Sequence, residues 1–574
     1  MDATKSLITN IFNNSTLVIV PFFQRSYVWK EDLWERMLDD MTYVVQSKHS
    51  HFFGSIILKK YNNPELGANY ADCRTIVDGQ QRLTTMLIFL KVLSLKLGQS
   101  VWFASQFRIM GQEIALRHSR RDVDAFEEVM AMEQAEEIDN STKNARIIDA
   151  YNYFVRNVDE TKMDIMTIVI NTQFVRIDLE KDEDEQQIFD TINSLGVNLT
   201  TSELLKNYFF SRETISEYDS KWVSVFEKDD ETKAYWETEI ETGRIKRTLI
   251  DIFFDAYFQI YIQDKKYNIS AEDKIVYART EHLAQSYQDF INTYCNGNKE
   301  VVLDKIKEYA HTFRENIRPS QCDMNTPRNY GIERLNVVIF GVKVSTLIPY
   351  ILYIAYNVDD RDEFDKMCGI LESYIMKRLI IHATSKNYNR LFLSFILNEV
   401  KDASSLIGAL DKVEDNTTFV PTDEDLKDGF LRSKLVNLQS RGILYLLESR
   451  IRPDFSSTAL LGFNNYSLEH LMPKKWRNNW PSCNDEDKAR LRDSKILTLG
   501  NLAIIPQALN SSIRDSDWKT KKTGTGENKP GLAKCASGLI TVHDALQLDD
   551  WDEERIMERG LWLYRQARQV WGCI

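Results

Sequence analysis

The chain has 574 residues, of which 43% are hydrophobic and 27% charged, so its composition excludes a disordered chain and its length predicts two to four domains. No apolar run is long enough for a membrane-spanning helix and the N-terminus lacks the features of a signal peptide, so we expect a cytoplasmic protein without a membrane partner. The net charge is −13, and the seven cysteines are scattered without a C-x-x-C pair, which favours reduced thiols and disfavours a cysteine-built zinc site.

The first two hundred residues alternate β-rich runs with amphipathic segments. Strands are predicted over residues 15–23 and 52–60, and a helix over 30–47, where apolar residues recur at helical spacing. A loop containing asparagine, proline and glycine is expected over 61–70. This alternation indicates an α/β domain at the N-terminal end.

The stretch "TIVDGQQRLTTMLIFL" begins with three β-favouring residues and continues into a long apolar stripe. We expect a strand that ends at Val77 and a helix with Asp78 as its N-cap, Gln81 in the capping-box position and Gly98 at its end. A turn needs a glycine and a cap. The additional amides and arginine therefore indicate a function at this corner.

Further along, the pattern changes from mixed to helical. A strand in "FVRIDL" is followed by a predicted helix, a turn at Gly196 and a second helix that Thr200 and Glu203 begin with a capping box. Residues 206–447 are predicted to be mostly helical, and their aromatic stripes are expected to pack in the core. The remainder reads as mixed strand, loop and helix.

Near the C-terminus, a spaced set of polar residues stands out. Glu469 and His470 lie on a predicted strand, Asn501 occupies a Gly-Asn corner, and Asn510 follows nine residues later after an apolar run. Around them, from Ser467 to Lys522, eleven Lys/Arg face seven Asp/Glu, a local basic excess in an acidic chain. This pattern is typical of a ββα-metal nuclease. For a single histidine or asparagine, the ordinary explanation of a strand end or a turn would prevail.

Phosphodiester hydrolysis accounts for each residue type. It needs a general base near neutral pH, which a neutral imidazole such as His470 provides. It also needs a hard cation on the phosphate oxygens, and Glu469 and Asn510 offer the oxygen ligands that Mg²⁺ or a similar divalent cation prefers. Asn501 would hold the loop so that His470 faces the water.

These C-terminal segments closely resemble the HNH (His-Me finger) domain of GmrSD-type, modification-dependent restriction enzymes; they read "LEHLMPKKW" and "LGNLAIIPQALNSSIRDSDWKTKK". The resemblance implies that His470 is the general base, that Glu469 and Asn510 are metal ligands, and that Asn501 orders the loop. Two positions depart from the common HNH pattern. Asn510 stands where many HNH enzymes have His, and Glu469 stands where many have Asp.

The N-terminal half is similar to the same family. The family signature D-G-Q-Q-R occurs verbatim at residues 78–82, and "PFFQRSYVW" at 21–29 and "FDTINSLGVNLTTSELLKN" at 189–207 resemble two further family elements. In the middle, "YIMKRLIIHATSKNYNRLF" also looks like the family. The resemblance implies a ParB/sulfiredoxin-like domain that binds and hydrolyses GTP or another nucleoside triphosphate.

A strand-to-helix corner at residues 77–79 suits phosphate binding. It presents free backbone N–H groups at the positive end of a helix, and Gly79 lets a phosphate approach the backbone. Arg82 or Arg25 can pair with phosphate oxygens. The predicted nucleotide-binding residues are Gln24, Arg25, Asp78, Gly79 and Arg82, to which the resemblance adds Asn193 and Lys206 at the edge of the site.

Catalytic roles are also expected in the D-G-Q-Q-R signature. Gln80 and Gln81 can orient a water molecule or a Mg²⁺-bound water, Asp78 can serve as a base or an outer metal contact, and Arg82 completes the predicted catalytic set. The alternative is that Asp78 only caps the helix and Arg82 makes a surface ion pair. No P-loop motif occurs in the chain, which disfavours a Walker-type ATPase.

The predicted fold is α+β and multidomain. It comprises a ParB-like α/β domain (1–207), a mostly helical middle (208–447) and a ββα-metal HNH nuclease domain (448–574). The predicted function is an NTP-regulated, divalent-metal-dependent endonuclease of anti-phage defence that cleaves or nicks modified double-stranded DNA. Two alternatives stay open: a phosphorothioate-sensing nuclease of the same architecture, and a non-catalytic nucleotide-switched DNA-binding adaptor. Assembly into a homo-oligomer is also left open.

Overall fold

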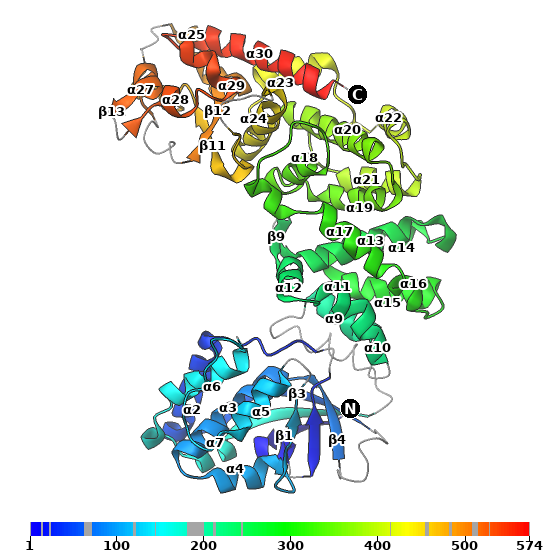
Figure 1. The fold of residues 1–574 in the computed structure, drawn as a ribbon, viewed down its shortest axis with the longest axis vertical. Coiled ribbons are helices and arrows are strands. Elements are labelled where there is room, and N and C mark those ends of the chain that lie inside the picture. The colour runs from blue at the N-terminus through cyan, green and yellow to red at the C-terminus, as the bar shows by residue number, and fades with distance from the viewer. Residues whose placement is uncertain are drawn as a thin grey trace. The chain divides into compact units, whose positions relative to one another are not determined.

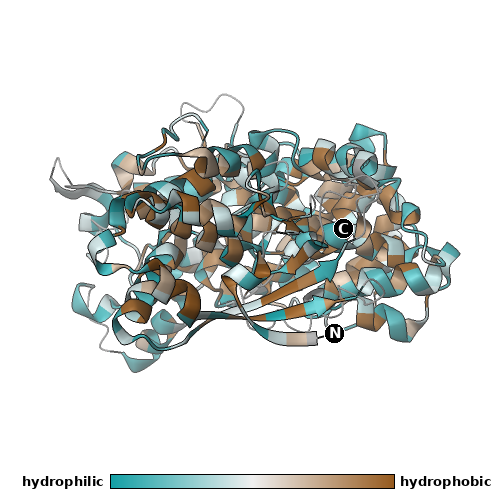
Figure 2. Ribbon diagram, turned by 90° about the horizontal axis from the view of Figure 1, so that it is seen from below, coloured by the Kyte–Doolittle hydropathy of each residue, from teal (hydrophilic) through white to brown (hydrophobic). Residues whose placement is uncertain are grey.

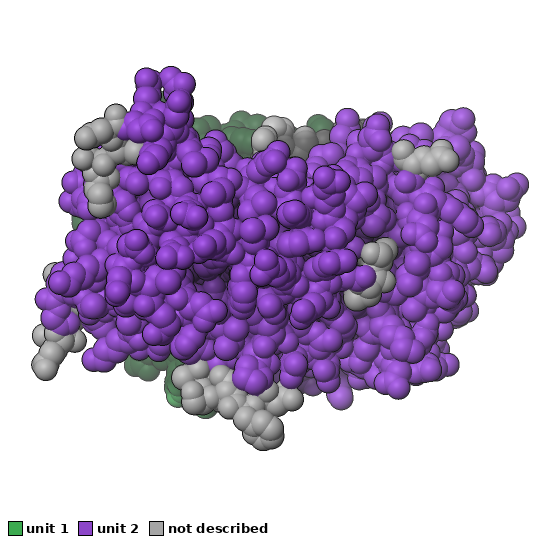
Figure 3. Space-filling view, turned by 90° about the horizontal axis from the view of Figure 1, so that it is seen from above, with its two compact units in different colours: residues 1–222 green, residues 223–574 purple. Residues whose placement is uncertain are grey.

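The computed structural model describes all residues except 1, 13–14, 22–23, 62–71, 119–121, 144, 181–199, 211–213, 243–244, 414, 454–458, 481–484, 508–514, 527–528 and 573–574. The chain forms two compact units, residues 1–222 and 223–574 (Figures 1 and 3). Hydrophobic and hydrophilic residues alternate along the helices and strands (Figure 2). None of the helices in the described part of the chain is long and apolar enough to cross a membrane.

The first unit is built on a six-stranded mixed sheet in the order β1-β8-β3-β4-β2-β7. The strands are β1 (Asp2–Leu7), β2 (Thr16–Ile19), β3 (His51–Lys60), β4 (Asp72–Asp78), β7 (Leu116–Arg117) and β8 (Thr172–Leu179). Strand β2 runs parallel to both β4 and β7. The carboxyl ends of these three strands therefore share one edge of the sheet, the place where open α/β sheets bind ligands.

Helices cover the sheet of the first unit (Figure 1). They are α1 (Ile8–Ile11), α2 (Glu31–Ser47), α3 (Gln80–Lys96), α4 (Ser100–Phe107), α5 (Val123–Ala131), α6 (Arg146–Asn157) and α7 (Ile165–Asn171). The unit ends with α9 (Thr201–Phe209) and α10 (Ile215–Tyr218). Helix α3 is the central one and is buried on almost every side, as expected for a helix that is apolar all round. Alternate strand residues serve two cores: Ile56 packs with α3, whereas Ile57 packs on the opposite face with Leu204 of α9.

The second unit begins with a helical region, as predicted. Its helices are α11 (Ser224–Phe226), α12 (Asp230–Glu237), α13 (Leu249–Gln263), α14 (Ala271–Tyr277), α15 (Leu283–Tyr294), α16 (Glu300–Leu303), α17 (Ile306–Asn316), α18 (Ile332–Asn336), α19 (Ile348–Asn357), α20 (Arg361–Ile380), α21 (Tyr388–Leu397), α22 (Ala403–Asp411), α23 (Asp423–Arg432) and α24 (Asn437–Ile451). The aromatic residues of α13 are buried, which confirms their packing role. A hairpin of β9 (Glu239–Thr242) and β10 (Ile245–Thr248) was not predicted.

The C-terminal part packs on this helical region. It contains β11 (Tyr466–His470), α25 (Glu486–Lys495), β12 (Leu502–Pro506), α27 (Trp518–Thr523), β13 (Gly524–Gly526), β14 (Lys529–Pro530), α28 (Leu532–Cys535), α29 (Ile540–His543) and α30 (Glu553–Trp571). Helix α24 lies against β11 and β12, and α30 lies against α20, α23 and α24. The predicted middle and C-terminal regions therefore share one compact unit.

Two predicted helix starts have different outcomes. Asp78 is not the N-cap of α3: it ends β4, and Gly79 caps the helix with φ +99° and without a side-chain hydrogen bond. The predicted capping box of Thr200 and Glu203 is present at α9. The turn at Gly196 and the helix predicted before it lie outside the described residues.

Candidate functional site

The strand pair β11–β12 brings the C-terminal site residues together. The two strands are antiparallel, and Glu469 and His470 of β11 lie opposite Ala503 and Leu502. Asn501 directly precedes β12 and therefore lies beside Leu471, the residue that follows His470. The Leu471 N–H donates to the Asn501 carbonyl at 2.9 Å. Residues about thirty positions apart thus meet at one end of a two-stranded ribbon.

Asn501 fixes the chain that follows His470. Its Nδ2 donates to the carbonyls of Met472 and Ile496 at 2.8 and 2.9 Å. Its Oδ1 accepts from the Met472 N–H at 2.8 Å and from the Trp551 indole at 3.0 Å. The side chain is 0% exposed, and all its donors and lone pairs are used. Asn501 therefore acts on the loop and has nothing left for a substrate.

Steric contact with α30 explains why a glycine precedes Asn501. A Cβ on Gly500 would lie 2.2 Å from the carbonyl oxygen of Ile556 in α30, so only glycine allows this approach. Arg559, one turn further along α30, donates to the carbonyls of Leu499 and Gly500 at 3.2 and 2.7 Å. Helix α30 therefore packs directly against the corner that carries Asn501.

Glu469 has a partner that the sequence did not reveal. The Lys521 ammonium contacts Glu469 Oε1 and also donates to the His470 carbonyl at 2.6 Å. Both side chains are buried, Lys521 completely. Burial raises the pKa of Glu469 and lowers that of Lys521, and the contact between the two opposes each shift. Lys521 had been counted only as one lysine of a basic patch.

The surroundings of His470 favour its neutral form. Its pKa is lowered to about 4, first by burial and then by the positive charges of Lys474 and Lys521. The imidazole is therefore neutral at neutral pH and has a lone pair to accept a proton. Lys474, Lys475 and Lys519, on the loop after β11 and on α27, are exposed.

The described residues of this region offer few donors for a metal ion. Among the residues that the structure describes, no group of three or more His, Cys, Asp or Glu side chains is arranged to hold a metal ion. Asn510 lies outside the described residues, and within them Glu469 Oε2 accepts no hydrogen bond. One free carboxylate oxygen fits Mg²⁺, which proteins often bind through one or two carboxylates, water and substrate phosphates.

In the first unit, three glutamines join two sequence motifs. Gln24 donates to two backbone carbonyls near the end of β4, at 3.1 and 3.0 Å. Gln80 and Gln81 donate to backbone carbonyls of residues 25–26, at 3.1 and 3.2 Å. Gln81 Oε1 also accepts a backbone N–H of this segment at 2.9 Å. These amides hold the "QRSYVW" segment, residues 24–29, against the start of α3, and within the described residues Gln80 Oε1 is buried without a hydrogen-bond partner.

The arginines of this corner differ in availability. Arg82 donates to the Ser55 carbonyl at 2.5 Å and lies 3.4 Å from Asp78 Oδ2. It therefore makes an ion pair, but a largely buried one with an aspartate that does not cap the helix, so the alternative of a surface pair beside a capping Asp78 does not hold as stated. Gly54, with φ +135°, leaves room for it, since a Cβ there would lie 2.9 Å from Arg82 Cδ. Arg25 is half-buried, and no ion pair or hydrogen bond of its guanidinium is found among the described residues. Of the two guanidinium groups, that of Arg25 is therefore the more available one.

Two further predicted residues of the first unit are less informative. Lys206 is buried in α9. Asn193 lies outside the described residues.

A buried polar cluster beside this corner was missed from the sequence. His118, just after β7, shares a hydrogen bond of 3.0 Å with Thr84, and its Nδ1 lies 3.9 Å from Asp122. Asp122 accepts the Tyr27 N–H at 2.7 Å. Burial lowers the pKa of His118 to about 3, so it is neutral. No local motif marks these residues, because strand pairing of β7 with β2 brings them to the corner.

Comparison with known proteins matches both ends of the chain. The model of the GmrSD restriction endonuclease N-terminal domain matches residues 8–210, and that of the GmrSD restriction endonuclease C-terminal domain matches residues 420–566. No curated protein matches the chain. The two matched regions together cover more than half of the sequence, and they contain both clusters described above. The chain therefore belongs to the GmrSD-type restriction endonucleases.

Proposed function

We propose that the protein is an NTP-regulated, metal-dependent endonuclease that cleaves or nicks modified DNA in anti-phage defence. The carrying observation is that Asn501 fixes the chain directly after β11, the strand whose last two residues are Glu469 and a neutral His470. A general base next to a buried carboxylate is the minimal equipment for hydrolysing a phosphodiester. Exposed Lys474, Lys475 and Lys519 are suited to the DNA backbone.

In the proposed reaction, His470 accepts the proton of a water molecule as the water oxygen attacks phosphorus. The bond from phosphorus to the leaving sugar oxygen breaks, and this oxygen takes up a proton from solvent water. Lys521 keeps the Glu469 carboxylate and the His470 backbone in place. Glu469, with Asn510, would hold Mg²⁺ or another divalent cation, which supplies charge stabilisation for the phosphate oxygens. Asn501 contributes by preventing the loop from moving, since its own polar atoms are occupied.

For the first unit, we propose binding and hydrolysis of a nucleoside triphosphate at the β4–α3 corner. The start of α3 offers unpaired backbone N–H groups at the edge where β2, β4 and β7 end. Arg25 would bind phosphate oxygens. The amide donors of Gln80 and Gln81 bind backbone carbonyls and are not available to orient a water molecule. The Asp78 carboxylate is therefore the group that would activate water.

The decisive experiment compares purified wild type, His470→Ala and His311→Ala on unmodified, base-modified and phosphorothioate DNA. Each reaction is run with Mg²⁺, with and without each NTP. His311 is a matched control because its side chain is 72% exposed and lies outside the site. We expect wild type and His311→Ala to cleave one modified DNA and His470→Ala to lose at least a hundredfold in rate.

Two results would contradict the proposal. Equal cleavage by His470→Ala would remove His470 from the chemistry. Absence of cleavage by wild type on every DNA, together with intact NTP binding, would favour the nucleotide-switched adaptor. Cleavage confined to phosphorothioate DNA would select the backbone-sensing alternative.

The nucleotide part has a separate test. Arg25→Ala should raise the KM for NTP hydrolysis at least tenfold, because a guanidinium–phosphate contact is lost. Arg36→Ala, on the exposed side of α2, serves as the control. An unchanged KM in Arg25→Ala would place the phosphates elsewhere.

A further inference from the structure

The buried Lys521 neutralises the carboxylate that the proposed nuclease site offers to a metal ion. Lys521 is 0% exposed, so it is not placed to contact DNA. It reaches the site from α27, 52 residues from Glu469 in sequence. Its Nζ contacts Glu469 Oε1 and the His470 carbonyl, which leaves Glu469 Oε2 as the oxygen without a hydrogen bond among the described residues.

The charges around this pair nearly cancel. Glu469 and Lys521 compensate each other, and the nearest charges that act on them are Asp515 and, through His470, Lys474. Among the described residues, the Glu469 carboxylate and the Lys521 ammonium therefore form a buried pair without net charge at the place where the carboxylate would meet a metal ion. A divalent cation at Oε2 would also lie close to the Lys521 ammonium, and a buried like-charge contact is screened less than one in water.

We propose that Lys521 is a resident counter-ion that keeps the site from capturing a divalent cation until DNA supplies a phosphate. The phosphate adds the negative charge that the side chains lack and provides further oxygen ligands. Metal entry would then depend on substrate, and the free enzyme would remain without its cofactor. This inference rests on the proposed nuclease function and adds a regulation of the same site.

A purely structural role of Lys521 makes a different prediction. In that case, removing the ammonium would loosen Glu469 and weaken metal binding or leave it unchanged. As a counter-ion, Lys521 opposes the metal, so removing it strengthens metal binding in the absence of DNA. The two roles therefore give opposite signs for the same measurement.

The test measures Mn²⁺ binding by electron paramagnetic resonance on the full chain without DNA. Wild type, Lys521→Met, Lys521→Arg and Glu469→Gln are compared. Methionine retains much of the buried volume of lysine without its charge, and circular dichroism verifies folding. We expect Lys521→Met to bind Mn²⁺ about tenfold or more tightly than wild type, Lys521→Arg to resemble wild type, and Glu469→Gln to bind no more tightly than wild type. Equal or weaker binding by folded Lys521→Met would overturn the proposal.

A second measurement leaves Lys521 unchanged. His470→Ala, which is designed not to cleave, is titrated with Mn²⁺ with and without the DNA that wild type cleaves, or with plasmid DNA if wild type cleaves none. We expect DNA to tighten Mn²⁺ binding at least tenfold, and an absence of tightening would overturn the proposal. Because binding is read without turnover, failure of this inference is distinguishable from failure of the nuclease function, which the cleavage assay reports.

Discussion

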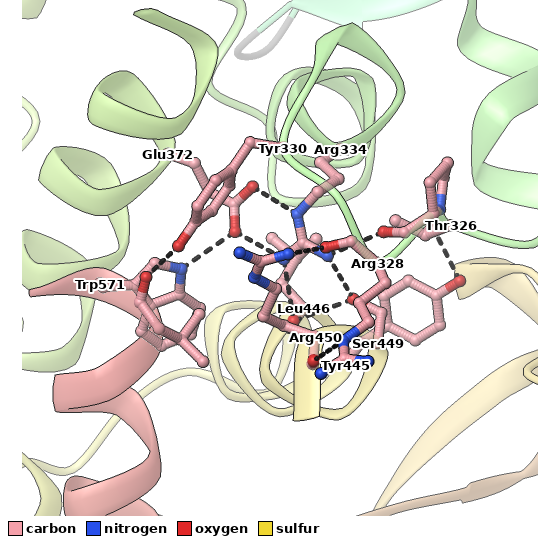
Figure 4. A network of polar contacts seen from close by, with 12 residues as sticks. Thr326, Arg328, Tyr330, Arg334, Glu372, Tyr445, Leu446, Ser449, Arg450 and Trp571 are labelled. Carbon is pink, nitrogen blue, oxygen red and sulfur yellow. Dashed lines mark hydrogen bonds and ion pairs between the residues drawn. The ribbon is translucent and has the colours of Figure 1, made fainter. Parts of the chain in front are cut away.

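Trp571, in the last turn of α30, donates its indole N–H to Glu372 Oε1 of α20 at 2.9 Å. The same carboxylate accepts two hydrogen bonds from Arg334, from Nη2 at 2.6 Å and from Nε at 2.7 Å (Figure 4). Near its other end, α30 touches Gly500 through Ile556. One helix therefore connects the Asn501 corner with the helical region of the same compact unit.

This arrangement predicts a cost for Trp571→Phe. The change removes one hydrogen bond to a buried carboxylate and should lower the free energy of unfolding by about 2 kcal/mol. Tyr564→Phe is the matched control, because Tyr564 is on the same helix and its hydroxyl bonds Asp423 at the exposed surface, at 2.8 Å. Its cost should stay below about 0.5 kcal/mol. Urea unfolding of the full chain measures both costs. Equal costs would show that the hydrogen bond to Glu372 stabilises the protein no more than the exposed one to Asp423.

The Arg334–Glu372 pair itself should respond in a non-additive way. Both side chains are buried, and Arg334 also donates to Ser449 Oγ and to the carbonyls of Pro327 and Leu446. Glu372→Leu leaves an uncompensated buried charge and should cost about 3–5 kcal/mol.

The double change Arg334→Met/Glu372→Leu should cost less than Glu372→Leu alone, because neither charge remains. Glu333→Leu is the control, since Glu333 lies in the same segment with 42% of its side chain exposed. Chemical unfolding with a double-mutant cycle gives the coupling energy. Additive costs would contradict the assignment of a coupled pair.

Local sequence signals predicted local structure well. Helix α2, strand β3 and the capping box of α9 follow from residues within a few positions of one another. The role of Lys521 does not, because Lys519, Lys521 and Lys522 look alike in sequence, and only the packing of α27 decides which is buried. The hairpin β9–β10 was missed for a related reason: its strands are short and largely exposed and carry no apolar alternation.

The N-terminal corner shows the same limit. The sequence indicated a function for the polar residues Gln80 and Gln81. An amide side chain can orient a catalytic water molecule or hold a backbone segment in place, and the residue type alone does not distinguish these roles. Their partners lie more than fifty residues away, in the segment that Gln24 begins, so only the fold shows that they bind backbone groups. His118 was missed altogether, because β7 is two residues long and its pairing with β2 carries no sequence pattern.

Gly500→Ala should damage the nuclease corner through sterics alone. Its Cβ would meet the Ile556 carbonyl at 2.2 Å, and this backbone atom cannot move without shifting α30. We expect a loss of about 2–3 kcal/mol in stability and reduced DNA cleavage, since Asn501 is the next residue. Gly408→Ala is the matched control: a Cβ there has open space in α22 and should stabilise the protein by about 0.5–1 kcal/mol. Thermal unfolding and DNA cleavage rates are measured for both variants. A Gly500→Ala variant with the stability and cleavage rate of wild type would contradict the close contact between Gly500 and Ile556.

His118 should make the stability of the first unit depend on pH. Its pKa is about 3 in the folded protein and 6.5 ordinarily, so between these values the unfolded chain binds a proton that the folded chain does not. Stability is therefore complete above pH 6.5 and falls as the pH drops toward 3. From pH 7 to pH 5 this one group should remove about 2 kcal/mol.

His118→Gln keeps a polar partner for Thr84 but cannot titrate, so its loss between pH 7 and pH 5 should be about 2 kcal/mol smaller than that of wild type. Native-state hydrogen exchange of the buried α3 amides measures this difference in the full chain. His311→Gln, exposed in the second unit, should follow wild type in these amides. If His118→Gln and wild type lose the same stability between pH 7 and pH 5, His118 takes up its proton in the folded state. The assignment of a buried, neutral imidazole would then be wrong.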